Sequence, residues 1–107
     1  MTDEELDALV AEKVMGWHKH KSGQSWFDAQ GQYHTRVYNW RPLENIDDAM
    51  MLTTRERLAH RPFGVKRDCF GETEAWFGTT VANVPSWDMA PRAICLAALK
   101  ACGIEVS

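Results

Sequence analysis

The sequence has few cysteines, and none of them is spaced to form a disulfide or a zinc site. Its 107 residues contain three cysteines and no Cys-x-x-Cys pair. Cys95 and Cys102 lie in one predicted helix, where about 1.5 Å of rise per residue separates them by roughly 10 Å. That separation is too long for a disulfide. We therefore expect reduced thiols, which are typical of a cytoplasmic protein.

Long apolar runs and an excess of basic residues are also absent. No run approaches the roughly 20 apolar residues that a helix needs to cross a bilayer. The acidic N-terminus lacks the charged and apolar regions of a signal peptide. The 12 Lys and Arg face 15 Asp and Glu, which gives a formal net charge of −3, whereas nucleic-acid-binding domains usually carry a basic excess. We expect a cytoplasmic protein with no membrane contact, and generic duplex DNA is disfavoured as a partner.

The sequence also lacks the motifs of common enzymes and cofactor sites. It has no G-x-S-x-G elbow, no phosphate-binding glycine-rich loop and no dinucleotide fingerprint. His18, His20 and His34 do not have zinc-finger or H-E-x-x-H spacing with each other or with the cysteines. Cys95 and Cys102 lie on the most apolar predicted helix, where a thiol behaves as a small hydrophobe. The sequence therefore predicts no enzyme, no catalytic residue, no cofactor and no metal.

Length and composition indicate one globular domain over residues 1–107. With 45% hydrophobic and 25% charged residues, the chain is ordinary for a folded protein. It has no linker, low-complexity tract or evident repeat. Five tryptophans are many for this length, and we expect most of them to pack in the core.

Helix signals occur in three segments, residues 2–16, 45–58 and 91–103. Thr2 and Glu5 have capping-box spacing at the start of the first segment. The last segment is apolar around most of its circumference, so we expect it to be buried on more than one side. We expect Gly103 to end this helix.

Strand signals occur between the helices. Residues 25–27 and 32–38 flank a turn at 28–31, after a polar stretch at 18–23 that we predict to be a loop. The order helix, hairpin, helix, hairpin, helix predicts an α+β fold. We expect an antiparallel sheet from two hairpins packed with three helices, an α-β-β-α-β-β-α sandwich.

The second predicted hairpin pairs residues 63–70 with residues 73–81. Its two-residue connection, Gly71-Glu72, has glycine where a type II′ turn requires it. This register places Arg67 opposite Trp76 and allows a cation–π contact between them.

Although the chain as a whole is acidic, residues 55–67 are rich in basic side chains. This stretch runs from the end of the second predicted helix into the second predicted hairpin. Guanidinium groups suit phosphate oxygens, and aromatic faces stack on bases. The alternative is that these cations only complement a helix end and solubilise the surface. The candidate ligand-binding residues are Arg55, Arg57, Arg61, Lys66, Arg67 and Trp76.

Residues 6–17 and 90–101 resemble the opening and the end of the phage ABA sandwich domain family. Trp26 with the turn that follows it, and the segment 42–46, fit the same pattern, although Leu43-Glu44-Asn45 replaces a more hydroxyl-rich run. The resemblance implies a compact α/β sandwich that is encoded by a phage or prophage and works in the host bacterial cytoplasm. It implies no established activity.

Two functions remain open. The first is a small non-enzymatic interaction module that binds a host or phage protein or associates with itself as a homo-oligomer, since aromatic residues are enriched in interface cores. The second is a sponge that sequesters a small anionic ligand, such as a nucleotide signal of bacterial defence.

Overall fold

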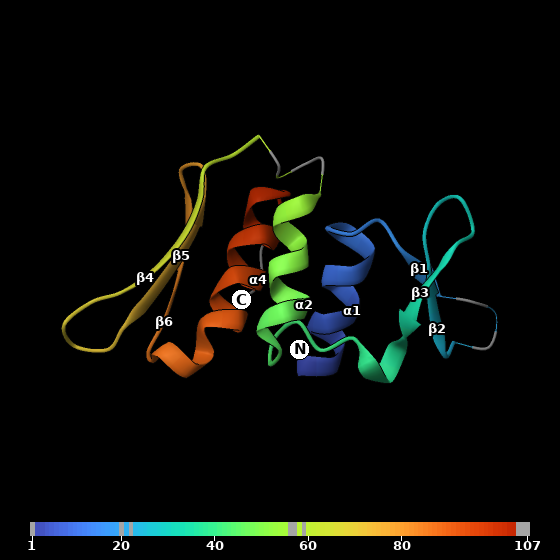
Figure 1. Cartoon of the computed structure of the whole chain (residues 1–107), viewed down its shortest axis with the longest axis horizontal. Coiled ribbons are helices and arrows are strands. Elements are labelled where there is room, and N and C mark those ends of the chain that lie inside the picture. The colour runs from blue at the N-terminus through green and yellow to red at the C-terminus, as the bar shows by residue number, and fades with distance from the viewer. Residues whose placement is uncertain (1, 20, 22, 56–57, 59, 105–107) are drawn as a thin grey trace.

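A computed structural model describes residues 2–19, 21, 23–55, 58 and 60–104. Helices form the middle layer, and a three-stranded antiparallel sheet covers each side of it (Figure 1). The elements in chain order are α1 (Asp3–Lys13), β1 (His18–Lys19), β2 (Ser25–Phe27), β3 (Tyr33–Arg36), η1 (Val37–Asn39), α2 (Ile46–Met50), η2 (Met51–Thr54), β4 (Phe63–Arg67), β5 (Thr73–Phe77), β6 (Thr80–Val84), η3 (Trp87–Met89) and α4 (Ala90–Ala101). The α+β class is confirmed, and each hairpin belongs to its own sheet.

The first helix begins and ends close to where its sequence signals place it. The Thr2 hydroxyl accepts a hydrogen bond from the Glu5 backbone N–H at 3.2 Å, as the capping box predicts. α1 ends at Lys13, and Gly16 then adopts a φ of 73°. Leu6 and Val10 form part of its buried face.

The second helix is shorter than we predicted. The Asn45 side chain caps it by accepting from the backbone N–H groups of Asp47 and Asp48, at 2.9 and 3.3 Å. α2 ends at Met50 and the 3₁₀ turn η2 follows, while residues 56–57 of the predicted helix lie outside the described residues. Thr53 and Thr54 donate their hydroxyls to carbonyls three residues earlier, at 2.8 and 2.7 Å. Such bonds compete with the regular helical pattern.

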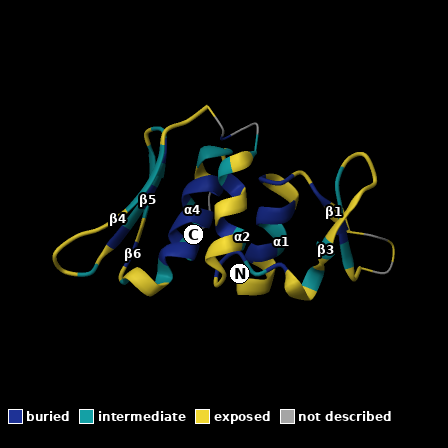
Figure 2. Ribbon diagram, viewed as in Figure 1, coloured by how far each residue is buried: buried dark blue, intermediate teal, exposed yellow. Residues whose placement is uncertain are grey.

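The last helix, α4, lies at the centre of the molecule and is buried along most of its length (Figure 2). It ends in a Schellman motif. Ile104 N–H donates to the Leu99 carbonyl at 2.9 Å and Gly103 N–H to the Lys100 carbonyl at 3.0 Å, while Gly103 takes a φ of 82°. The predicted burial and stop are both confirmed.

The first sheet has the order β1-β2-β3. Its predicted hairpin is confirmed, but the preceding polar stretch is not only a loop, because His18 and Lys19 form a short strand that pairs with Phe27 and Trp26. The β2–β3 turn is built on Asp28, whose side chain accepts two backbone N–H bonds within the turn, each at 2.9 Å.

The second sheet corrects the predicted hairpin. β4 ends at Arg67, and residues 68–72 form a five-residue loop instead of a two-residue turn at Gly71-Glu72. Its Asp68 repeats the Asp28 arrangement and binds the backbone N–H groups of Phe70 and Glu72 at 2.9 and 3.0 Å. The aspartate therefore takes residue 68 out of the strand pairing.

The register and the strand count of this sheet differ from expectation as a result. Arg67 lies opposite Thr73, and Trp76 lies opposite Gly64, so the expected pairing of Arg67 with Trp76 is wrong. The Trp76 ring occupies the space where a Gly64 side chain would lie, because an added Cβ would come within 2.0 Å of it. The expected strand 73–81 is broken at Gly78, which has a φ of 63° and starts the turn into β6.

Candidate functional site

A pocket of about 500 Å³ lies between α1, the first sheet and the segment that follows β3. We call it the α1 pocket. Its walls combine aromatic rings with charged groups, and the residues that define it best are Asp7, Lys19, Trp26, Tyr38, Trp40 and Arg41. This volume lies within the range of about 300–1,000 Å³ that is typical of ligand sites.

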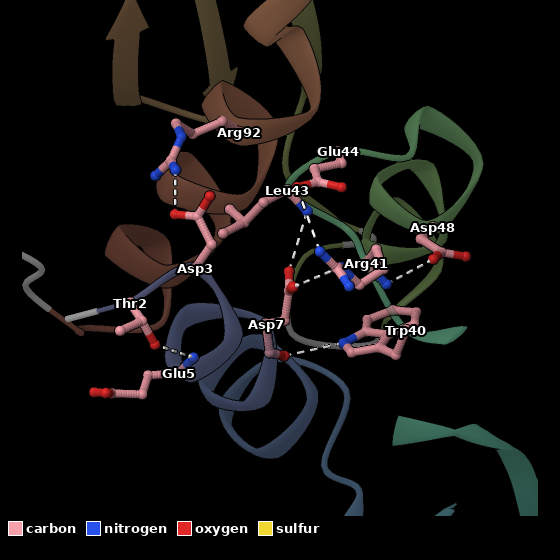
Figure 3. A network of polar contacts seen from close by, with 10 residues as sticks. All are labelled: Thr2, Asp3, Glu5, Asp7, Trp40, Arg41, Leu43, Glu44, Asp48 and Arg92. Carbon is pink, nitrogen blue, oxygen red and sulfur yellow. Dashed lines mark hydrogen bonds and ion pairs between the residues drawn. The ribbon is translucent and has the colours of Figure 1, made fainter. Parts of the chain in front are cut away.

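Asp7 connects α1 to the chain that enters α2 (Figure 3). Its Oδ1 accepts from the Leu43 backbone N–H at 3.2 Å, and its Oδ2 lies 3.7 Å from the Arg41 Nε. Its backbone carbonyl accepts from the Trp40 indole Nε1 at 3.0 Å. These contacts fix the position of the segment that closes one side of the pocket.

Arg41 is held on its other sides as well. Its backbone N–H donates to Asp48 at 3.0 Å, and its guanidinium lies 3.4 Å from Glu44. The buried Nε has no hydrogen-bond partner in the described part of the chain. The guanidinium therefore sits at the pocket wall with part of its donor capacity unused.

Burial perturbs the carboxyl of Asp7. The residue is 5% exposed, and this desolvation raises its pKa from 3.8 to about 6, although the Leu43 N–H and the Arg41 charge oppose the shift. A pocket carboxyl with such a pKa is an acid–base candidate. Both of its oxygens, however, face Leu43 and Arg41, which is the arrangement of a group that orders the wall (Figure 3).

Aromatic rings form the rest of the site. Trp26 and Trp40 are buried, while Tyr38 is 67% exposed and lies at the opening. The Lys19 Nζ lies 5.4 Å from the centroid of the Trp26 ring, within cation–π range. Trp17 packs edge-on against Trp40, with ring centroids 4.7 Å apart, and so supports it from behind.

His34 and Asp28 form a second polar pair on the first sheet. The His34 Nε2 lies 3.0 Å from the Asp28 Oδ2, and the imidazole stacks on Trp17 with centroids 4.7 Å apart. The Gln32 backbone N–H, followed by the His34 side chain, lowers the pKa of Asp28. The pair therefore connects the β2–β3 turn to Trp17 through the His34 ring.

The predicted basic site lies elsewhere. Arg67 and Lys66 are exposed neighbours on β4, where adjacent side chains point to opposite faces of the sheet. Arg61 precedes this strand and lies near Gly78, and Arg55 follows η2. Trp76 faces outward over Gly64 on the same sheet. Arg57 lies outside the described residues.

None of these described basic residues lines the α1 pocket, which lies beyond the helix layer from the second sheet. A role of the basic stretch in binding stays a prediction.

The sequence interpretation missed the α1 pocket. One signal was available: Asp7 lies between Leu6 and Val10 on the apolar side of the first helix, where a carboxylate needs a partner. The partner, Arg41, is distant in the sequence, so no spacing rule connects the two.

The described residues contain no group of three or more histidine, cysteine or acidic side chains that could hold a metal ion. Among the described helices, none is long and apolar enough to span a membrane.

Two sheets around a helical layer, with a pocket beside α1, define a small α+β sandwich domain. The chain belongs to the phage ABA sandwich domain family, whose model matches residues 8–99. The family has no established activity. A crystal structure of a phage protein from Bacillus cereus ATCC 14579 has a TM-score of 0.65 and 21% identity to this chain, and the alignment covers 100% of this chain and 93% of that one. This likeness shows the fold. A comparison with curated proteins gave no match.

Proposed function

We propose that this phage-family domain is a non-enzymatic binding module, and that its site is the α1 pocket. The observation that carries the proposal is the combination of buried tryptophans with cationic side chains around one cavity of about 500 Å³. Such walls suit a planar or aromatic group that carries charge beside it, because the rings provide contact area and the charges provide orientation. The preferred occupant is an aromatic side chain of a protein partner.

The polar groups of the pocket support binding more than catalysis. The Oδ1 of Asp7 accepts from the Leu43 N–H and its Oδ2 faces Arg41, so the carboxyl is oriented toward the pocket wall. Trp40 is fixed by its bond to the Asp7 carbonyl. Rigid, preorganised walls of this kind reduce the entropic cost of binding.

A second candidate function is the sequestration of a small anionic, nucleotide-type ligand. Lys19 and Arg41 favour it, since both cations line the same cavity as the aromatic rings. A base would stack on Tyr38, the exposed ring of the pocket, while an anionic group meets the cations. Glu4 and Asp7 in the same walls reduce the net positive charge and rank this function second.

The tyrosine at the opening provides a direct test with a matched control. We expect Tyr38→Ala to weaken probe binding about fivefold or more, because an exposed aromatic at the rim contributes contact without supporting the fold. Tyr33→Ala is the control: Tyr33 is 56% exposed on β3, the strand before Tyr38, but does not line the pocket. The probes are N-acetylphenylalaninamide and adenosine monophosphate, titrated while the tryptophan indole N–H signals are followed by NMR.

Each outcome of that titration has a clear meaning. Shifts of the Trp26 and Trp40 signals with the phenylalanine probe support the interaction module, and a preference for the nucleotide supports the sponge. If neither probe moves these signals, or if Tyr33→Ala weakens binding as much as Tyr38→Ala, the α1 pocket is not the binding site.

A further inference from the structure

Phe70 is the most exposed of the large apolar side chains in the described chain, at 91%. It stands at the tip of the β4–β5 hairpin, in the loop of residues 68–72, which we call the Phe70 turn. Aromatic side chains that are isolated, exposed and held in place are frequent anchors of protein interfaces.

The backbone of the Phe70 turn is locked. Asp68 accepts from the N–H groups of Phe70 and Glu72, and its own N–H donates to the Glu72 carbonyl at 2.9 Å. Gly71 takes a φ of 89°, which suits glycine. The phenyl ring is therefore presented on a preorganised support, which lowers the ordering cost of an interaction.

The turn itself does not require an aromatic residue. In the matching β2–β3 turn, the residue two places after the aspartate is Gln30, and its N–H makes the same bond to Asp28 at 2.9 Å. Local structure thus explains Asp68 and Gly71, but it does not explain the phenylalanine.

Phe70 cannot reach the α1 pocket of its own chain. The turn lies at one end of a molecule 46 Å long, on the far side of the helix layer from α1 and the first sheet (Figure 1). An aromatic group that fills this pocket must come from another molecule, and a second copy of the chain provides one.

Charges around the two surfaces are complementary. Glu72 is exposed beside Phe70, and Lys66 lies one residue before the end of β4. At the pocket, Lys19 and Glu4 are both exposed, and neither has an ion-pair partner among the described residues. In the orientation that sets Glu72 of the turn against Lys19 of the pocket, insertion forms a pair of opposite charges, and pairs of this kind select an orientation.

We propose that the Phe70 turn of one copy inserts into the α1 pocket of a second copy, with Glu72 facing Lys19. This inference rests on the proposed function, because it names the protein partner of the same site. The contact joins two different surfaces, so it is heterologous and builds head-to-tail chains or a closed ring. One turn in one pocket buries little area, so the association is weak and depends on concentration.

Sedimentation velocity across a concentration series tests the self-association. We expect the unmodified protein to form larger species as its concentration rises, and Phe70→Ser to weaken this association about tenfold or more. Trp87→Ser is the matched control, since Trp87 is also exposed, at 48%, and does not line the pocket. A protein that stays monomeric throughout, or oligomers unaffected by Phe70→Ser, would overturn the inference.

A mixing experiment identifies the geometry. Phe70→Ser keeps an intact pocket and Lys19→Glu keeps an intact turn, so each variant alone should be monomeric while their mixture forms a 1:1 heterodimer that grows no further. The double variant Lys19→Glu, Glu72→Lys should regain self-association. A mixture without heterodimer would indicate a symmetric Phe70 contact and refute insertion. If the pocket still binds N-acetylphenylalaninamide in that case, the proposed function survives and its partner is another protein.

Discussion

Two of the hairpin turns, β2–β3 and β4–β5, have the same backbone hydrogen bonds and present different side chains. Asp28 and Asp68 organise their turns with equivalent hydrogen bonds, and the tips of both turns are exposed (Figure 2). Asp28 also pairs with His34, whose ring stacks on Trp17. The residue at the matching tip position is Gln30 in one and Phe70 in the other. Local chemistry therefore specifies the shape of a turn, and the side chains that it presents specify its use.

The sheets that carry these turns differ in how closely they meet the helices. β5 directs Thr73, Ala75 and Phe77 onto α4, and all three are fully buried. The facing helix is rich in alanine, which lets the sheet approach closely. On the other side, Trp26 and Trp40 hold the first sheet away from α1, and the space between them is the α1 pocket.

The largest expected effect is a difference in the free energy of unfolding between variants of the two sheets. Phe77→Ala should cost about 3–5 kcal/mol, because the ring is fully buried against α4 and Phe63 and its removal leaves a cavity. Trp26→Phe should cost about 1 kcal/mol or less, since the Trp26 indole N–H has no hydrogen-bond partner to lose and the ring borders the pocket. Urea unfolding of both variants measures the difference. A loss of about 3 kcal/mol or more for the milder change Trp26→Phe would contradict the looser packing of the first sheet.

The pH dependence of stability gives the next effect. The pKa of Asp7 is raised from 3.8 to about 6, so the folded state binds this proton more tightly than the unfolded state. Stability should therefore fall as the pH rises from about 4 to about 6, by up to about 3 kcal/mol. Asp7→Asn keeps an oxygen for the Leu43 N–H and should remove this slope. A slope that persists in the variant would assign it to another group.

Asp28, in the β2–β3 turn, should change stability with pH in the opposite direction to Asp7. Its pKa is lowered in the folded protein, so its contribution is present above the unfolded pKa and is lost as the pH falls through the folded value. Comparing the unfolding curves of Asp28→Asn and Asp7→Asn from pH 3 to 7 (about the range of both titrations) separates the two contributions. We expect the two variants to change the slope in opposite directions.

The smallest expected effect is a difference in urea midpoint between variants of the two aspartate turns. Asp28→Ala and Asp68→Ala each remove two backbone hydrogen bonds, and both should lower the urea midpoint modestly. Asp28→Ala should lower it more, because it also releases His34 from its ion pair. Asn at either position is the control, since it can keep the bonds to the backbone. An equal loss in both alanine variants would show that His34 contributes nothing.

Local signals in the sequence were sufficient for much of the fold. The side-chain caps at Thr2 and Asn45 and the glycine stop at Gly103 all appear where the spacing predicts them. The first hairpin follows in the same way from Asp28 and Gly31. These features depend on contacts between residues within a few positions of one another, so a short window of sequence contains the whole cause.

Errors occurred where a local pattern supported more than one structure. In the second hairpin, Gly71 could start a two-residue turn or end a five-residue one, and the Asp68 side chain selects the latter by its bonds to Phe70 and Glu72. Because the turn is longer than predicted, Trp76 pairs with Gly64 instead of Arg67. The end of α2 was misplaced for a similar reason, because threonine hydroxyls compete for helical carbonyls.

The sequence by itself determined the α+β class, the membership of the family and the chemistry of the Asp28 turn. Only the tertiary structure decided that the hairpins form separate sheets and that Asp7 meets Arg41 and Leu43 beside a cavity. The physical reason is the distance along the sequence between the residues that make each contact. Caps and turns are satisfied by neighbours along the chain, whereas a buried carboxylate and an aromatic pocket are made by segments more than thirty residues apart, which only the packing of the helix layer brings together.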